Sequence, residues 1–323
     1  MKNLTRKMIT AGVAATMAAS LGIVANAEEA TYKVGICQLI QHEALDAATQ
    51  GFQDALTEKL GDRVEFDVQN ASGESVNCST IINGFVSDQV DLILANATGA
   101  LQAAVAGTSD IPILGTAVTD YATALDIDDW TGTVGGNVSG TSDCAPLDQQ
   151  AAMILELVPE AKTVGMLYCS AEPNSEYQVN VVTEALKELN PDLEIKNYTF
   201  ADSNDISSVA TSATECDVVY IPTDNTAANN TEAINNVMEP AGVPVIAGEA
   251  GICQGCGIAT LSISYYDLGY TTGEMAYEIL EDGADISTME VQYAPNVTKQ
   301  YMADRCEKLG ITVPDDYEAI EAE

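Results

Sequence analysis

The segment KVGICQLIQHEALDAATQGFQDAL, residues 33–56, decides the fold of this chain. Residues 33–40 are mostly apolar and predict a strand, and residues 44–59 carry the spacing of an amphipathic helix. A strand that runs directly into a helix is the repeating unit of α/β folds. The same alternation continues along the chain, so we expect parallel sheets covered by helices on both faces.

The segment that precedes this unit has the three parts of a secretory signal peptide. Lys2, Arg6 and Lys7 are basic, residues 8–25 are apolar and small, and Ala25-Asn26-Ala27 offers a cleavage site. A membrane anchor is the alternative, but a run rich in Ala, Gly and Thr is weakly hydrophobic for a stable span. We therefore expect residues 1–27 to be removed and the protein to be exported, to the periplasm or the cell surface.

The composition limits the partners of the mature chain, residues 28–323. Loss of three basic residues and no acidic one takes the formal net charge from −37 to −40. A chain this acidic repels nucleic acid and anionic membranes. Since 46% of the residues are hydrophobic, it can still bury a core. We expect a monomer that does not bind nucleic acid.

Two series of strand and helix patterns follow one another along the chain. They meet at NVSGTSDCAP, residues 137–146, where Gly, Ser and Thr are frequent and a proline precedes a helix. A further helix near 266–280 and a strand near 290–294 predict that the chain crosses back between the series. The expected fold is α/β, with two Rossmann-like doubly wound lobes joined by a multi-crossing hinge. The first lobe would comprise residues 28–138 and 265–289, and the second 139–264 and 290–323.

Polar clusters follow several of the predicted strands, where ligands bind in open parallel sheets. The same residue types also serve as ordinary helix N-caps, so each cluster alone has two interpretations. Together they predict a ligand site. The clusters contain Gln41-His42-Glu43, Asn96-Ala97-Thr98, Thr119-Asp120-Tyr121, Ser170–Ser175, Pro222–Asn225 and Gly248-Glu249.

The sequence offers little chemistry for catalysis or metal binding. His42 is the only histidine, and no G-x-S-x-G or Walker-type motif occurs. We therefore predict a protein that is not an enzyme and holds no metal or cofactor. Cys253 and Cys256 form a single C-x-x-C in a Gly-rich stretch that we expect to be a loop. A local disulfide is the first interpretation of this pair, and two free thiols the second.

The distribution of charges constrains the ligand. No Lys or Arg occurs between Arg63 and Lys162, so phosphates and dicarboxylates lack their usual partners. A zwitterionic amino acid fits, because helix N-termini can hold its carboxylate and an acidic side chain its ammonium group. Tyr121 and Tyr265 are among the tyrosines that could form an aromatic wall, and a neutral sugar remains an alternative ligand.

The motifs QHEALD (41–46), NVSGTSD (137–143) and PTDN (222–225), in this order, resemble one known family. It is the family of ABC-transporter substrate-binding proteins associated with tryptophan and other aromatic amino acids, which have the type I periplasmic-binding fold. The resemblance covers essentially the whole mature chain. It implies no catalysis, a ligand between two lobes, and contacts at His42, Thr119, Asp120, Ser139, Gly140, Thr141, Asp143, Glu172, Asn174, Ser175, Thr223, Asp224, Asn225 and Glu249.

The expected function is therefore capture of an amino acid, aromatic by resemblance, and its delivery to the permease subunits of an ABC importer. Asn96, Tyr121 and Tyr265 complete the expected contacts. The alternatives are a binding protein for a branched amino acid, a nucleoside or a sugar, and the ectodomain of a sensor. An exported hydrolase is disfavoured by the single histidine, and a transcription regulator is excluded by the export signal.

Overall fold

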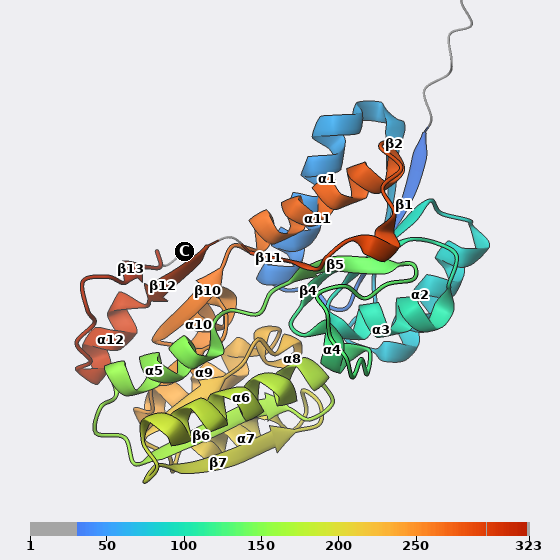
Figure 1. Ribbon diagram of the computed structural model, residues 1–323. Helices are drawn as coiled ribbons and strands as arrows, with labels where there is room; N and C mark the ends of the chain where they lie inside the picture. The colour runs from blue at the N-terminus through green and yellow to red at the C-terminus, as the bar shows by residue number, and fades with distance from the viewer. Residues whose placement is uncertain (1–30, 295, 322–323) are drawn as a thin grey trace, which may run out of the picture. The chain divides into compact units, whose positions relative to one another are not determined.

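The computed structural model describes residues 31–294 and 296–321. Two sheets form the framework, each with helices on both faces (Figure 1). The predicted signal peptide, residues 1–27, lies outside the described residues. Within the described ranges, no helix has the length and apolar character needed to cross a membrane.

The first sheet has the strand order β11-β5-β4-β3-β1-β2 and is parallel between all of these neighbours. Its strands are β1 (Tyr32–Gln38), β2 (Val64–Asn70), β3 (Leu92–Asn96), β4 (Ile113–Val118), β5 (Val138–Ser142) and β11 (Gln292–Tyr293). The helices of this lobe are α1 (Glu43–Leu60), η1 (Gly61–Arg63), α2 (Ser75–Ser87), α3 (Thr98–Gly107), α4 (Tyr121–Ala124), α11 (Tyr265–Leu280) and η2 (Ile286–Thr288).

The second sheet has the order β13-β12-β10-β9-β8-β6-β7 and is parallel except for the antiparallel pair β10 and β12. Its strands are β6 (Thr163–Cys169), β7 (Glu194–Phe200), β8 (Val218–Ile221), β9 (Val245–Ala247), β10 (Ala259–Ile263), β12 (Val297–Tyr301) and β13 (Glu318–Ala319). Its helices are α5 (Leu147–Leu157), α6 (Pro173–Leu189), α7 (Ile206–Ala213), α8 (Asn225–Ala228), α9 (Thr231–Ala241), α10 (Ala250–Cys256) and α12 (Ala303–Leu309).

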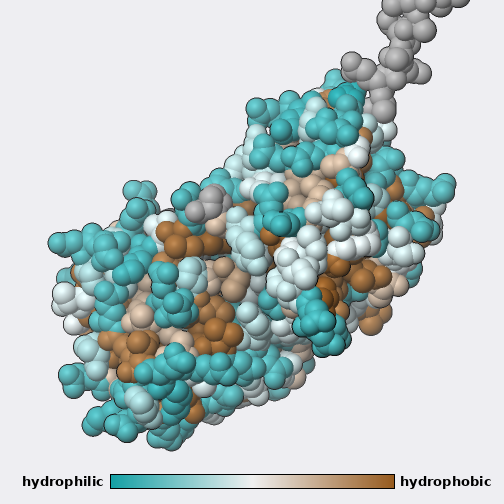
Figure 2. Space-filling view, in the orientation of Figure 1, coloured by the Kyte–Doolittle hydropathy of each residue, from teal (hydrophilic) through white to brown (hydrophobic). Residues whose placement is uncertain are grey.

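The period-2 alternation of the strands explains why both faces of each sheet are covered. Leu92 and Leu94 of β3 pack with α1 and α11, whereas Ile93 packs into the core under α2 and α3. In the second sheet Met166 faces α5 and α6, and Leu167 faces α7, α9 and α10. Hydrophilic residues cover most of the surface in the view of Figure 2, with apolar groups in scattered patches.

The lobe boundaries differ from those expected from the sequence. The division after residue 138 falls at the first residue of β5, which pairs with β4 in the first sheet through Ser142. Likewise β11 pairs with β5 and lies in the first sheet, so this sheet extends to Tyr293 rather than ending before 290. The chain passes between the sheets after β5, after β10 and after β11.

β5 begins only at Val138 because the preceding residues turn. Gly132, Gly135 and Gly136 have φ of 93°, 85° and 60°, the left-handed region that glycine adopts without strain. β5 itself is polar yet fully buried, because its hydroxyl groups are bonded internally. The Ser142 Oγ donates to the carbonyl of Thr119 at 2.8 Å, for example.

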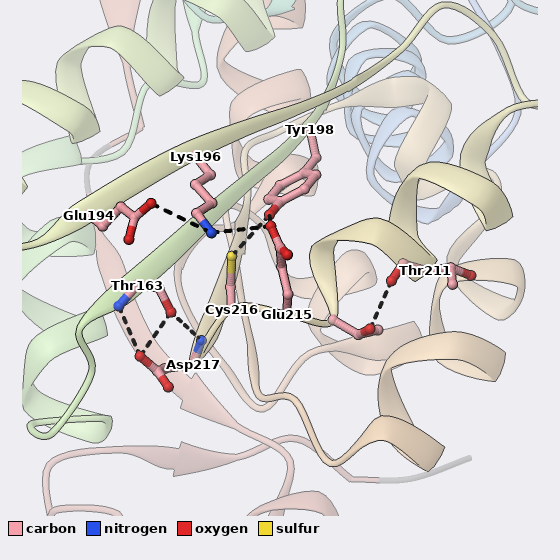
Figure 3. A network of polar contacts seen from close by, with 9 residues as sticks. Thr163, Glu194, Lys196, Tyr198, Thr211, Glu215, Cys216 and Asp217 are labelled. Atoms are coloured by element: carbon pink, nitrogen blue, oxygen red, sulfur yellow. Dashed lines mark hydrogen bonds and ion pairs between the residues drawn. The ribbon is translucent and has the colours of Figure 1, made fainter.

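A polar network secures the outer edge strand β7 (Figure 3). Lys196 of β7 pairs with Glu215 at 3.1 Å, and the Tyr198 hydroxyl donates to the same carboxylate at 2.7 Å. Nearby, the Asp217 Oδ2 accepts from the backbone N–H of Thr163 at 2.9 Å, where β6 begins. A charged lysine on an edge strand opposes pairing with another chain, so we interpret this network as structural.

Helices α1 and α11 approach each other closely enough to exclude side chains between their backbones. A Cβ at Gly269 would lie 1.9 Å from the carbonyl oxygen of Ala48, and one at Gly51 would lie 2.1 Å from that of Tyr266. Such distances leave no room for a methyl group. These glycines therefore set the distance between α1 and α11. The starts of both helices contribute to the site described below.

We predict that Gly269→Ala lowers the free energy of unfolding by about 1–3 kcal/mol, because the added methyl group forces the two helices apart. Urea denaturation monitored by circular dichroism measures the change. Gly84→Ala is the matched control, since a Cβ at Gly84 in α2 meets nothing within 4 Å, and alanine is the better helix former. Equal stability of the two variants would contradict this packing account.

Candidate functional site

A pocket lies between the two sheets, where the carboxyl ends of strands from both lobes meet. His42 follows β1, Thr119 follows β4, and Asp143 follows β5, all from the first sheet. Its remaining lining comes from Leu45, Ala117, Asn174, Thr223, Asp224, Asn225, Ala228, Glu249 and Tyr265. This central pocket has a volume of about 10 Å³, room for roughly one water molecule.

Direct hydrogen bonds join the lobes around the central pocket. The His42 Nε2 lies 3.1 Å from the Asn225 Oδ1, which joins the start of α1 to the start of α8. The Gln178 Nε2 donates to the Thr119 Oγ1 at 3.4 Å. The lobes are therefore in contact, and the arrangement described here is a closed one.

Two of the pocket carboxylates are fully occupied as helix N-caps. The Asp224 Oδ1 accepts from the Ala227 N–H at 2.8 Å, and its Oδ2 accepts from the Cys169 N–H at 2.6 Å and the Ser175 hydroxyl at 2.8 Å. The Glu249 oxygens accept from the N–H groups at positions 251 and 252, at 2.7 and 2.5 Å. Each oxygen of both side chains therefore already accepts at least one hydrogen bond from the protein.

Glu172 stands behind the pocket and is occupied in the same way. Its Oε1 accepts from the backbone N–H and the hydroxyl of Thr226, at 2.8 and 2.7 Å. Its Oε2 accepts from the backbone N–H and the side-chain amide of Asn225, at 2.9 and 2.8 Å. This carboxylate holds the first turn of α8 and thereby positions Asn225 in the pocket.

Asp143 differs from these three acids because one of its oxygens is free. Its Oδ2 accepts from the Tyr265 hydroxyl at 2.8 Å, whereas its buried Oδ1 has no hydrogen-bond partner among the residues that the structure describes. The residue is only 5% exposed. A buried carboxylate oxygen without a partner is costly, so a ligand that donates a hydrogen bond here would gain the most.

The electrostatics of the pocket follow from acids that are buried without a cation. Burial raises the pKa of Asp143, although the hydrogen bond from Tyr265 acts against that shift. Burial also raises the pKa of Glu249 to about 7 and that of Asp224, where the neighbouring charge of Glu172 adds to the effect. The pocket therefore favours a cationic group, which would stabilise the ionised acids.

Nine of the seventeen contact residues expected from the sequence line the central pocket: His42, Thr119, Asp143, Asn174, Thr223, Asp224, Asn225, Glu249 and Tyr265. Glu172 and Ser175 lie behind it and hold lining residues. Three apolar lining residues, Leu45, Ala117 and Ala228, were not expected. No polar pattern marks them, because a ligand contact through a small apolar side chain has no signature in a single sequence.

The other six expected residues belong to the first lobe and do not line the pocket. Asn96 donates to the carbonyl of Leu45 at 2.8 Å inside the lobe, and Asp120 caps α4 through the Thr123 N–H. The Tyr121 hydroxyl donates to the carbonyl of Thr141 at 3.1 Å. The remainder, Ser139, Gly140 and Thr141, are interior residues of β5, although the sequence places them at the junction of the two series of strands and helices.

The predicted disulfide between Cys253 and Cys256 is wrong, because both cysteines are free. The expected loop is the helix α10, which the Glu249 cap begins. Arg305 closes its other end by donating to the carbonyls of residues 253, 254, 255 and 257. In the part of the chain that the structure describes, no cluster of His, Cys, Asp or Glu could hold a metal ion.

Comparisons with known proteins agree with this architecture. The family model for ABC transporter substrate binding proteins matches residues 33–322. Over 252 residues the chain is 37% identical to a tyrosine-binding protein of Clostridioides difficile (strain R20291), which covers 77% of this chain and 72% of that protein.

Two solved structures resemble the chain to different degrees. An ABC domain in complex with L-Trp from Streptococcus pneumonia is 29% identical with a TM-score of 0.85, covering 90% of this chain and all of that one. A ligand-free, open substrate binding protein with adhesive properties from Clostridium difficile is 34% identical with a TM-score of 0.69, covering 91% and 100%. The higher structural similarity to the complex, despite lower identity, agrees with the closed pocket.

The fold is that of type I periplasmic binding proteins. The family model spans almost the entire described chain, and the tyrosine-binding relative is more than one third identical to it in sequence. This chain belongs to the ABC transporter substrate binding protein family.

Proposed function

We propose that this protein captures an amino acid with an aromatic side chain between its lobes and delivers it to an ABC importer. The observation that carries the proposal is Asp143, whose buried Oδ1 has no partner in a pocket without a cation. An ammonium group is the donor that such a carboxylate favours most. The tyrosine-binding relative and the L-Trp complex support an aromatic ligand.

The carboxylate of the ligand would bind at the start of α1. Helices α8 and α10 have their first turns filled by Asp224 and Glu249, whereas the N-cap residue of α1, His42, makes no side-chain cap hydrogen bond. Leu45 of this first turn lines the central pocket. Backbone N–H groups at an uncapped helix N-terminus attract an anion, so the carboxylate of the zwitterion would be drawn to the start of this helix.

The transport role follows from the location of the ligand between the lobes. A bound zwitterion would contact residues of both sheets and favour the closed arrangement. The permease subunits would then receive a closed, loaded protein. We include in the proposal that the chain is exported through residues 1–27 and acts as a monomer, without catalysis, cofactor or nucleic acid.

We predict that Asp143→Asn weakens binding of L-Trp, L-Tyr and L-Phe by roughly 10- to 100-fold, because a neutral amide replaces the charged partner of the ammonium group. Isothermal titration calorimetry on ligand-stripped protein, residues 28–323, measures the effect.

Glu184→Gln is the control for this experiment, since it removes the same charge from an exposed residue that does not line the central pocket. Wild-type affinity of the Asp143→Asn protein for all three amino acids would contradict the assignment. Absence of binding by the wild-type protein would contradict the proposed ligand class itself.

The affinity should also depend on pH with a definite sign. Because burial raises the pKa of Asp143 and an ammonium group binds the ionised carboxylate, affinity should fall as the pH drops through that raised pKa. The affinity should be regained at pH values above this pKa. At the lower pH, binding of the ammonium group should release the proton from Asp143.

Calorimetry in buffers with different ionisation enthalpies counts this proton. In Asp143→Asn the part of the pH dependence that belongs to Asp143 should vanish, and what remains would report Glu249. An affinity that increases toward acidic pH would contradict the proposed ammonium contact.

A further inference from the structure

A larger cavity adjoins the central pocket, and we call it the side cavity. Its volume is about 340 Å³, within the range of small-molecule sites. It lies where the starts of α1, α9 and α10 meet and is lined by Gln41, His42, Glu43, Ala228, Asn229, Thr231, Glu249, Gly251, Gln254 and Gly255. His42, Ala228 and Glu249 line the central pocket as well, so these three residues border both spaces.

A cavity near α4 and α6 does not adjoin the central pocket. It has a volume of about 290 Å³ and is lined by Thr123, Pro173, Glu176, Tyr177, Asn180, Val181 and Glu184. None of these residues lines the central pocket. The central pocket has room for about one water and none for an aromatic ring. Of these two cavities, the side cavity is the one that a ligand held at Asp143 could reach.

Gly251 of the side cavity lies beside two carboxylates. A Cβ at this position would lie 3.2 Å from the Glu249 Oε2 and 3.5 Å from the Glu43 Oε2. Glycine therefore keeps the space next to these two carboxylates free of a side chain. Since Glu43 begins α1 and Glu249 precedes α10, the two carboxylates come from different lobes.

The lining of the side cavity is polar, and part of it is exposed to solvent. Among the described residues, the side chains of Glu43, Asn229 and Gln254 have no hydrogen-bond partner, in contrast to the capped acids of the central pocket. The lining contains no Phe, Tyr or Trp, no lysine or arginine, and no aliphatic side chain larger than that of Ala228. Most of its side chains can form hydrogen bonds with a polar group.

We propose that the side chain of the bound amino acid extends past Gly251 into the side cavity, where Glu43 and Gln254 select a side chain that ends in a hydrogen-bonding group. The inference rests on the proposed function and narrows it to ligands such as a phenol-bearing amino acid. A phenol would donate to the Glu43 carboxylate and accept from the Gln254 amide. A phenyl ring would cover both groups but could not replace the hydrogen bonds that they make to water. The loss of these hydrogen bonds would weaken binding.

Calorimetry with L-Tyr and L-Phe on the wild-type protein and on Glu43→Gln and Gln254→Leu tests this inference. We expect the wild-type protein to bind L-Tyr roughly tenfold or more tightly than L-Phe. Gln254→Leu should bring the two affinities together, chiefly by weakening L-Tyr. Glu43→Gln is an isosteric change at an exposed residue that leaves folding unthreatened, and it should reduce the ratio in the same direction.

Asn180→Leu is the matched control, because it places leucine in the cavity near α4 and α6 that a ligand would not enter. Its ratio of L-Tyr to L-Phe affinity should equal that of the wild-type protein. Equal wild-type affinities, or a ratio that neither Glu43→Gln nor Gln254→Leu changes, would overturn the inference while leaving amino acid binding intact. A wild-type protein that binds neither amino acid would instead overturn the proposed function.

Discussion

The central constraint in this protein is the burial of several carboxylates in one pocket without a cation beside them. Hydrogen bonds from helix N-termini stabilise the buried carboxylates of Asp224, Glu249 and Glu172, because backbone N–H groups and hydroxyls donate to their oxygens. The same groups cannot serve Asp143, whose Oδ1 has no partner. A ligand ammonium group would complete the set, so under the proposed function the acids would both support the second lobe and select a cation.

Asp143, the proposed partner of the ligand ammonium group, lies beside crossings between the lobes. It directly follows β5, where the chain first leaves the first sheet, and its partner Tyr265 begins α11, where the chain returns. Both residues therefore lie next to crossings between the lobes. A ligand held there would act on the segments that must bend when the lobes close. The tight backbone contact between α1 and α11 ties the same return segment to the start of α1.

Much of the fold could be predicted from the sequence, since the alternation of strands and helices in residues 33–56 and beyond is strongly periodic. The predicted site residues do not all lie at the central pocket. Polar residues after β1, β8 and β9 do reach the central pocket. Ser139, Gly140 and Thr141 are instead buried in β5, where hydroxyl groups form hydrogen bonds within the lobe. In the sequence such a polar strand looks like a loop. The C-x-x-C motif similarly lies in a helix, which the Glu249 cap begins and the Arg305 contacts with its carbonyls close. Composition does not reveal such side-chain and long-range contacts, so the sequence predicted a loop here.

The most direct test of this account is a crystal structure of residues 28–323 in complex with an aromatic amino acid. The account predicts the ligand nitrogen within hydrogen-bond distance of the Asp143 Oδ1, roughly 2.7–2.9 Å for such a charged pair, and the ligand carboxylate at the first turn of α1. A ligand bound in the reverse orientation, or at a place remote from Asp143, would contradict the claim that this one free carboxylate oxygen organises the site.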